Sequence, residues 1–339
     1  MDLDKIVVRG DHDSLTLDQM KNAAAHPAVA AAALCADGHL GYAVPVGGVI
    51  AYEGHVSPAG VGVDIGCGNK AVRLDVPAAK VRKRVSRIMD QVVRHVSFGM
   101  GRNNAEEVEH PLFDLDVWDL PALAPLKDRA RMQLGTVGGG NHYCNVMVDE
   151  EERVWIGVHF GSRGLGALTA QYFNKAAREA GHVFNGVEVL PVDSELGQEY
   201  LAAMDLAGQY AYAGRDWVCR TIASICDSGI VEEVHNHHNF AWKETHFGRE
   251  LWVVRKGSTP AFPGQKGFVG ASMAEPSVIL EGVESEESQA LLYSTVHGAG
   301  RAMSRTAAKG KKGHPGKVTR DMLETSVRKA GVCLRGGDV

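Results

Sequence analysis

Apolar residues recur along the chain with spacings that predict both helices and strands. In residues 77–97, Val and Ile recur every three or four positions, as on the buried face of an amphipathic helix. Residues 16–34 are rich in alanine and predict a helix that is interrupted near Pro27. The other apolar patterns predict two helices and two strands, over 167–180, 197–228, 154–160 and 251–255.

The predicted helices and strands do not alternate regularly. Residues 36–72 are apolar and dotted with glycine, which predicts short strands and turns. Residues 102–131 are polar and contain proline, so we expect a surface excursion there. Residues 309–317 are basic and glycine-rich and predict a loop. Without a regular βαβ pattern, an α+β fold is favoured over a doubly wound sheet.

The polar face of the predicted 77–97 helix is strongly basic. Two interpretations stay open: a solvated face, which is the common case, or a strip that contacts phosphates. Its cationic residues are Lys80, Arg82, Lys83, Arg84, Arg87 and Arg94.

Composition narrows the class of protein. Of 339 residues, 45% are hydrophobic and 23% charged, which excludes wholesale disorder. The net charge of −5 argues against a protein that coats nucleic acid through overall charge. No apolar stretch is long enough to span a membrane, and residues 1–5 lack the apolar core of a signal peptide, so we expect a cytoplasmic protein. The six cysteines form no CxxC pair and predict reduced thiols.

Glycine and histidine are abundant, at 40 and 15 residues, and five short segments combine glycine with reactive side chains. Together, Asp, Cys and His side chains suit a divalent transition metal, because thiolate and imidazole are poor ligands for Mg²⁺ and Ca²⁺. A bridging thiolate would permit two ions, as in two-metal phosphoryl transfer. The segments are 60–69, 138–142, 159–166, 235–239 and 297–301.

These candidate ligands are far apart in the sequence. If they form one site, residues 60–300 fold as one unit, which argues against the two domains that the length suggests. The glycine spacing in 60–66 does not fit a dinucleotide fingerprint, and the chain has no phosphate-binding loop of the Gly-Lys-Ser/Thr type.

In combination and order, these segments resemble the RtcB family of RNA-splicing ligases. The resemblance extends from Asp37 to Arg335. It is carried by GVDIGCG at 62–68, Gly140-Asn141-His142, HFGSRGLG at 159–166, His238-Asn239, RKGSTPAFPG at 255–264, Ser272-Met273 and HGAGRAMSR at 297–305.

The resemblance implies a single RtcB-like catalytic domain over 1–339, with mixed β-sheets flanked by helices around a central metal cleft. It implies an enzyme that joins RNA 2′,3′-cyclic phosphate or 3′-phosphate ends to 5′-hydroxyl ends, using GTP and two Mn²⁺ ions, in RNA repair or tRNA splicing. One ion would be held by Asp64, Cys67 and His142, and the other by Cys67, His159 and His238.

By the same resemblance, His297 is the nucleophile that becomes guanylylated. An imidazole nitrogen can attack the GTP α-phosphate and so divide one difficult step into two. A protein that activates the enzyme is a possible further partner. The nucleotide site implied by the resemblance comprises Asn141, His142, Asn145, Asn239, Ser272, Met273, Ser277, His297, Gly298, Ala299 and Gly300.

The chain departs from the family pattern at three places. Asn145 stands where the family has a glutamate that contacts guanine, so the preference for GTP is open. The segment 270–278 differs from the usual Pro-Gly-Ser-Met-Gly run. The sequence also ends before the family's further segment, which carries a nucleotide-contacting lysine. Two alternatives therefore stay open: a metal-dependent phosphoesterase that opens cyclic phosphates, or an inactive RNA- or nucleotide-binding paralogue.

Several other polar residues have two interpretations. We expect His235 and His237 to have structural or supporting roles. His39 and His55 either line the site or are structural. Arg163 and Arg301 either bind RNA phosphate in a bidentate manner or brace loops. Residues 309–317 either guide RNA or form a solvated loop.

Overall fold

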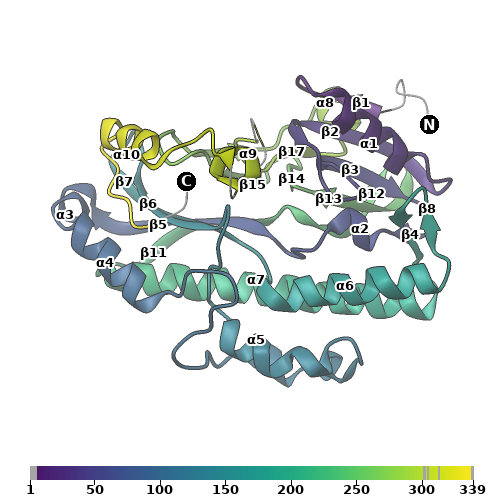
Figure 1. Ribbon diagram of the computed structural model, residues 1–339, viewed down its shortest axis with the longest axis horizontal. Coiled ribbons are helices and arrows are strands. Elements are labelled where there is room, and N and C mark those ends of the chain that lie inside the picture. The colour runs from purple at the N-terminus through teal and green to yellow at the C-terminus, as the bar shows by residue number, and fades with distance from the viewer. Residues whose placement is uncertain (1–5, 301–302, 304, 312–313, 337–339) are drawn as a thin grey trace.

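Two β-sheets lie end to end in the computed structural model, which describes residues 6–300, 303, 305–311 and 314–336 (Figure 1). One sheet has five strands in the order β1-β2-β3-β13-β12, and the other has four in the order β11-β5-β7-β6. Strands β1 and β2 are parallel, whereas the other neighbouring strands in these sheets are antiparallel. The prediction of an α+β fold with mixed sheets is confirmed.

The bounds of the strands show how the two sheets are built from distant parts of the chain. The five-stranded sheet comprises β1 (Ile6–Val8), β2 (Val29–His39), β3 (Val46–Tyr52), β12 (Asn239–His246) and β13 (Arg249–Lys256). The four-stranded sheet comprises β5 (Gly68–Pro77), β6 (Tyr143–Val148), β7 (Arg153–Phe160) and β11 (Ile230–His237). Shorter strands are β4 (His55–Val56), β8 (Val183–Phe184), β9 (Val187–Glu188), β10 (Leu190–Pro191), β14 (Ser258–Pro260), β15 (Lys266–Val269), β16 (Val278–Glu281), β17 (Ser294–Val296), β18 (Gly310–Lys311) and β19 (His314–Pro315).

Helices α6 (Arg163–Glu179) and α7 (Glu195–Ile225) run below the sheets in Figure 1. The 31 residues of α7 span about 46 Å at 1.5 Å per residue. Ser194 caps α7 by accepting a hydrogen bond from the Gly197 N–H at 3.0 Å. The other helices are α1 (Ser14–Ala24), α2 (Pro58–Val61), α3 (Ala78–Arg82), α4 (Val85–His95), α5 (Lys127–Gln133), α8 (Glu286–Ala290), α9 (Arg305–Lys309) and α10 (Arg320–Lys329).

Apolar side chains of α7 cover the four-stranded sheet. Val218 and Ile222 are fully buried and belong to the same core cluster as Ile156 and Val158 of β7. This burial ties the longest helix to the strand that carries His159, since apolar surface removed from water stabilises the contact by about 25 cal/mol per Å². Among the described residues, no helix is both long and apolar enough to cross a membrane.

Sequence periodicity correctly located β7, β13, α6 and α7, whereas two other predicted helices differ from the structure. The predicted helix over 16–34 is wrong in its second half, because α1 ends at Ala24 and 29–34 belong to β2. There Leu34 is buried between β1 and β3, so tertiary pairing outweighs the helical tendency of alanine. The predicted helix over 77–97 is divided into α3 and α4, with Lys83 and Arg84 between them.

The segment 102–131 is anchored to the core by three buried side chains, although it was expected to be a surface excursion. Leu112, Phe113 and Trp118 are each at most 4% exposed and lie in its short 3-10 turns, Pro111–Asp114 and Asp116–Asp119. Helix α5 follows and projects below α6 and α7 in Figure 1. The expected loop at 309–317 contains the short pair β18 and β19.

Candidate metal centre

Asp64 and Cys67 are brought together by a tight turn between α2 and β5. The Cys67 N–H donates to the Asp64 carbonyl at 3.0 Å. Gly66, between them, has a φ of +70°, and a Cβ there would lie 3.1 Å from the backbone of Gly208 on α7. A side chain at this position would therefore be strained by both the backbone angle and the helix.

Three histidines reach the same point from different elements. His142 precedes β6, and His159 lies near the end of β7, paired with Asn69 on β5. His238 lies between β11 and β12, where the chain passes from one sheet to the other, and its N–H donates to the Cys67 carbonyl at 2.8 Å. The site thus lies at the junction of the two sheets.

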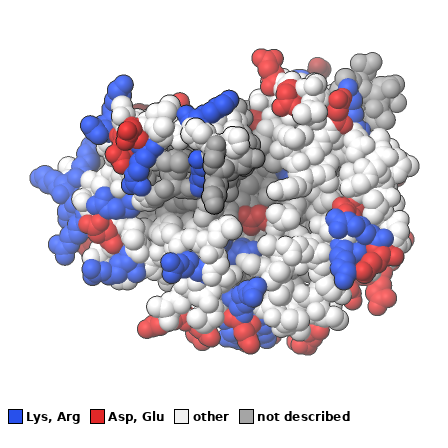
Figure 2. Space-filling view, in the orientation of Figure 1, with Lys and Arg blue, Asp and Glu red and all other residues white. Residues whose placement is uncertain are grey.

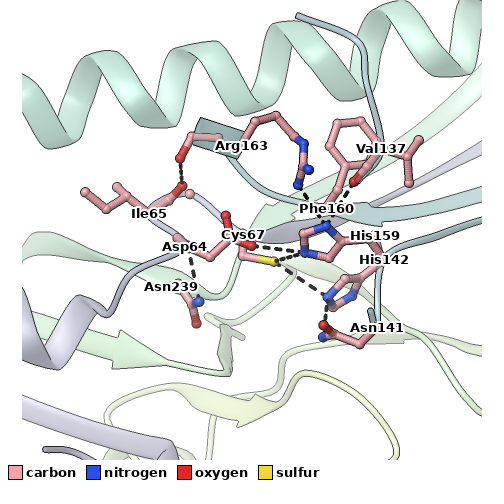
Figure 3. A network of polar contacts seen from close by, with 12 residues as sticks. Asp64, Ile65, Cys67, Val137, Asn141, His142, His159, Phe160, Arg163 and Asn239 are labelled. Carbon is pink, nitrogen blue, oxygen red and sulfur yellow. Dashed lines mark hydrogen bonds and ion pairs between the residues drawn. The ribbon is translucent and has the colours of Figure 1, made fainter. Parts of the chain in front are cut away.

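Cys67 is the centre of this cluster (Figure 3). Its Sγ lies 3.7 Å from Nε2 of His142 and 3.6 Å from Nε2 of His159. The Asp64 carboxylate lies 3.0 Å from Nε2 of His142. Donor atoms of Cys67, His142 and His159 all lie within 4.8 Å of one another, a spacing that could hold a metal ion.

The other ring nitrogen of each histidine is held by an acceptor of the protein. Nδ1 of His142 lies 2.9 Å from the Val137 carbonyl, Nδ1 of His159 lies 2.7 Å from Oδ1 of Asn69, and Nδ1 of His238 lies 3.1 Å from Oδ1 of Asn239. The two asparagine oxygens can only accept, so Nδ1 of His159 and of His238 carries the proton and Nε2 of each keeps its lone pair. This is how metal-ligating histidines are oriented in proteins.

A buried nitrogen without a hydrogen bond gives an independent test of whether a cation fits. Nε2 of His238 is buried and has no hydrogen-bond partner among the described residues. Leaving such a group unpaired is costly, and a cation would satisfy it. A set of imidazole, thiolate and carboxylate donors suits Mn²⁺, Fe²⁺, Co²⁺ or Zn²⁺. The residues present therefore fit a divalent transition metal.

Burial sets the protonation states in this cluster. It lowers the pKa of His159 and His238 well below the usual value, and neighbouring histidines act in the same direction. Both imidazole rings are therefore neutral and can each offer a nitrogen lone pair to a metal ion. Burial, together with the Asp64 carboxylate, raises the pKa of the Cys67 thiol. Burial also opposes ionisation of Asp64, but contacts with His142 outweigh it and lower the pKa of that carboxyl.

His297 lies beside the cluster with one ring nitrogen engaged. Its ring centroid is 4.7 Å from that of His238 and 6.5 Å from that of His159. Its Nδ1 lies 2.6 Å from Oδ2 of Asp37, and the same oxygen accepts from the N–H groups of His297 and Gly298 at 3.0 and 3.3 Å. Asp37 thus fixes the ring and leaves Nε2 as the nitrogen with a lone pair.

The three asparagines predicted for the nucleotide site occupy different positions. The Asn141 amide nitrogen lies 3.4 Å from Nε2 of His159, inside the cluster. Asn239 holds the site together, since its amide nitrogen donates to the Asp64 carbonyl at 3.2 Å and its Oδ1 accepts from the Gly257 N–H at 2.7 Å. Asn145 is half-buried on β6 and shares its side with Tyr143, whose ring stacks on His159.

The predicted pocket segment at 270–277 reaches His297 through its backbone. Gly270 forms an isolated bridge with Gly298. Within this loop, the Ser272 hydroxyl donates to Glu275 at 2.9 Å, Ser277 accepts from the Ala271 N–H at 3.2 Å, and Met273 is 42% exposed. Ala299 is exposed, and Gly300, with a φ of +69°, packs against Asp37.

Of the other histidines and arginines that the sequence singled out, some lie at the Cys67 cluster and others lie elsewhere. Arg163 Nη1 lies 3.1 Å from Nδ1 of His142, so it braces the cluster. Nδ1 of His39 lies 3.0 Å from the Asp37 carbonyl. His55 instead lies near His26, with 5.5 Å between ring centroids and the rings tilted. Arg301 lies outside the described residues.

His235 and His237 belong to a buried network around Arg215 of α7. The Arg215 guanidinium is fully buried and donates to the Gly66 and Phe160 carbonyls at 2.9 and 2.6 Å. It also donates to Nε2 of His235 at 2.8 Å. Gly66 precedes Cys67 and Phe160 follows His159, so one side chain ties together the backbones next to two candidate ligands.

We expect Arg215→Met to lower the free energy of unfolding by about 3–5 kcal/mol, because it removes a buried donor from the Gly66 and Phe160 carbonyls and from Nε2 of His235. Urea denaturation measures this difference. Arg249→Met is the matched control, since that exposed arginine lies 3.4 Å from Glu53 at the surface, and we expect a change within about 0.5 kcal/mol. Equal effects of the two substitutions would contradict the bracing role.

Sequence reasoning missed three functional residues: Asp37, Asn69 and Arg215. Asp37 marks the start of the resemblance and Asn69 ends the glycine-rich segment 60–69, so their polar side chains in apolar, glycine-rich runs were an available signal. Arg215 lies in a long helix, and nothing in its local sequence distinguishes it from a surface arginine.

The fold and the site define an α+β protein with a candidate metal centre at the junction of two sheets. Beside this centre lies His297, whose Nδ1 is held by Asp37 and whose Nε2 keeps its lone pair. A family model described as tRNA-splicing ligase RtcB matches residues 19–118 and 119–332. The chain belongs to the RtcB family.

Individual relatives agree with this assignment. The RNA-splicing ligase RtcB of Escherichia coli K12 is 34% identical over 312 residues, covering 82% of this chain and 75% of the relative. The tRNA-splicing ligase RtcB of Thermococcus kodakarensis is 32% identical, covering 86% and 77%. That of Archaeoglobus fulgidus is also 32% identical, covering 87% and 78%.

Proposed function

We propose that this chain is an RNA ligase that joins 2′,3′-cyclic phosphate or 3′-phosphate ends to 5′-hydroxyl ends through a nucleotidylated histidine, with GTP as the nucleotide and Mn²⁺ as the metal. The observation that carries the proposal is the placement of His297, whose Nδ1 is held by Asp37 beside the Cys67 cluster. The family assignment supports the same activity. A cytoplasmic location and an activating partner stay predictions.

Five residues would hold the metal: Asp64, Cys67 and His142 on one side, and Cys67, His159 and His238 on the other. When bound, the metal supplies charge neutralisation at phosphate oxygens and orients the reacting groups. Since these ligands meet at the junction of the two sheets, we also propose that residues 1–339 act as a single catalytic unit.

In the proposed first step, Nε2 of His297 attacks the α-phosphorus of the nucleoside triphosphate. A phosphorus–nitrogen bond forms, the bond to the β-phosphate oxygen breaks, and pyrophosphate leaves. The ring becomes cationic as the bond forms. Asp37 accepts the Nδ1 proton in a hydrogen bond and stabilises this charge without rearrangement.

In the later steps, the RNA 3′-phosphate takes the nucleotidyl group from Nε2 of His297 and so regenerates the free imidazole. The RNA 5′-hydroxyl then displaces the nucleoside monophosphate and the phosphodiester forms. A cyclic phosphate is first opened by water. In this proposal Asn141 contacts the nucleotide phosphate from beside His159, and Asn145, Ser272, Met273 and Ser277 lie on the side of the base.

Covalent labelling tests the proposal. The whole chain is incubated with Mn²⁺ and either α-labelled GTP or ATP, denatured, and examined for label bound to protein. We expect acid-labile label on the native chain and none on His297→Ala. His55→Ala, which lies away from the cluster, should be labelled like the native chain.

The outcome also separates the alternatives and reports on the base. A stronger signal with GTP than with ATP would show that Asn145 and its neighbours preserve guanine preference. Label that persists on His297→Ala would reject His297 as the nucleophile. If the metal-loaded chain took no label but opened cyclic phosphates, the phosphoesterase would replace the ligase.

A further inference from the structure

Positive charge is concentrated at one end of the protein. Residues 78–95 contain six of the 36 Lys and Arg of the chain but only one of its 41 Asp and Glu, although the whole chain has a net charge of −5. These residues form α3, α4 and the two-residue link between them. Figure 2 shows Lys and Arg side chains gathered at the end of the molecule where Figure 1 places α3, α4 and α10.

Some of these cations are already paired. Lys80 binds Asp227 at 2.9 Å, and Arg82 binds Glu152. The single acidic residue of the segment, Asp90, is neutralised by Arg335 at 2.7 Å. These pairs leave no free carboxylate within 78–95 to compensate the remaining cations.

Lys83, Arg87 and Arg94 are the cations of this surface that remain available. All three are exposed, and none forms an ion pair within the described part of the chain. Arg87 and Arg94 are seven positions apart on α4, so they lie on one face about 10 Å from each other. Lys83 lies in the link that directly precedes α4, and we call these three residues the α4 cationic face.

The α4 cationic face is held rigidly. The opposite side of α4 buries Ile88 and Val92, which are at most 2% exposed, in the core that α7 forms with the four-stranded sheet. The α4 cationic face is therefore fixed relative to β5 and β7. Preorganised charges bind a polyanion with less loss of conformational entropy than flexible ones.

Strands β5 and β7 connect this face to the candidate metal centre. β5 begins directly after Cys67 and ends at Pro77, where α3 follows, while β7 runs back from Arg153 to His159. Ten residues of strand span about 33 Å. At the roughly 3.4 Å per base pair of DNA this corresponds to about ten base pairs, and the shorter rise of an A-form RNA duplex makes the number somewhat larger.

We propose that the α4 cationic face binds phosphates in the base-paired stem of an RNA whose cut ends lie at the Cys67 cluster. The inference rests on the proposed function for the identity of the partner. Double-stranded RNA fits because proteins recognise it mostly through shape, phosphates and 2′-hydroxyl groups, which a rigid row of cations can contact. The face thereby selects RNA ends that close a stem long enough to reach it.

Direct binding measurements with two RNA probes test this inference. Both probes carry a 3′-phosphate and a 5′-hydroxyl at the same break, but one has a stem of about 16 base pairs and the other of about four, too short for the span. The variant combines Lys83→Ala, Arg87→Ala and Arg94→Ala. The control combines Lys175→Ala, Lys243→Ala and Arg249→Ala, which removes the same charge from other exposed sites.

We expect the α4 variant to bind the long-stem RNA at least tenfold more weakly, and the control to bind it like the native chain. The slope of log Kd against log salt concentration should be smaller for the α4 variant than for the native chain by about two to three. Each lost phosphate contact accounts for about 0.9 of this difference. The short-stem RNA should bind all three proteins equally. Nucleotide labelling at His297 should be the same in all three.

Three results would overturn the inference: no loss in the α4 variant, equal loss in the control, or equal loss with the short-stem RNA. If the α4 variant bound the long-stem RNA as tightly as the native chain but bound an acidic protein more weakly, the α4 cationic face would be a site for a protein partner. That result would reject RNA as its ligand. Binding is measured without ligation, so failure of labelling on the native chain would reject the proposed function separately.

Discussion

Cys67→Ala is expected to lower the affinity of the protein for Mn²⁺ or Co²⁺ by on the order of 100-fold or more. Its Sγ lies within 3.7 Å of Nε2 of both His142 and His159, so the thiolate is placed to serve both halves of the proposed centre. A single substitution should therefore affect every bound ion. Metal content after loading and gel filtration measures the loss, and thiolate-to-Co²⁺ absorption provides a second readout.

Cys219→Ala is the matched control for Cys67→Ala. Cys219 is also a fully buried thiol, but it lies on α7 in the apolar core. We expect this variant to lose some stability through the small cavity and to retain its metal. If Cys67→Ala kept full metal loading, or lost no more than Cys219→Ala, the bridging role would be rejected.

The spacing of apolar residues was sufficient to predict those helices and strands whose buried side chains recur at one regular interval. The α7 helix and the β7 strand lie within a few residues of their predicted bounds, because their apolar faces are read directly from the sequence. The alanine-rich segment 29–34 has no such pattern. Its conformation is decided by β1 and β3, one of which precedes it and the other follows it, so no local rule assigns it to a sheet.

The candidate ligands were predictable for a different reason. Asp64, Cys67, His142, His159 and His238 each stand in a short motif, so residue type and order were sufficient to propose them. The contacts that orient their rings are not encoded locally. Val137 supplies a backbone carbonyl to His142, and a carbonyl has no sequence signature.

The same limitation explains why the fully buried Arg215 was not found. Its importance comes from the carbonyls of Gly66 and Phe160, which are 149 and 55 residues away along the chain. The sequence of a helix specifies which face is apolar, and a buried cation on that face contradicts the pattern. Only the folded chain shows that its guanidinium donates to the Gly66 carbonyl before β5, to the Phe160 carbonyl at the end of β7, and to Nε2 of His235 on β11.

Asp37→Asn is expected to slow nucleotide labelling of His297 by about 10²–10⁴-fold, in the range found when the carboxylate that orients a catalytic histidine is replaced by an amide. One carboxylate oxygen, Oδ2, accepts from Nδ1 of His297 and from two backbone N–H groups. The other oxygen is buried and has no hydrogen-bond partner among the described residues.

An asparagine cannot satisfy this arrangement in either orientation. If its oxygen takes the place of Oδ2, its NH₂ group is buried without an acceptor at Oδ1. If its NH₂ group faces His297, it meets two backbone donors and forces the ring into the tautomer with Nε2 protonated. Either orientation also removes the negative charge that would stabilise the cationic ring during attack.

The rate of labelling in single-turnover experiments measures this effect, and metal content and urea denaturation are determined on the same preparation. We expect Asp37→Asn to retain its metal, because Asp37 contacts none of the five proposed ligands. Asp18→Asn, an exposed change on α1 that removes the same charge, should label at the native rate. Native labelling by Asp37→Asn would show that the Asp37 contact does not control the nucleophile. Loss of metal together with labelling would instead show that Asp37 maintains the whole cluster rather than one ring.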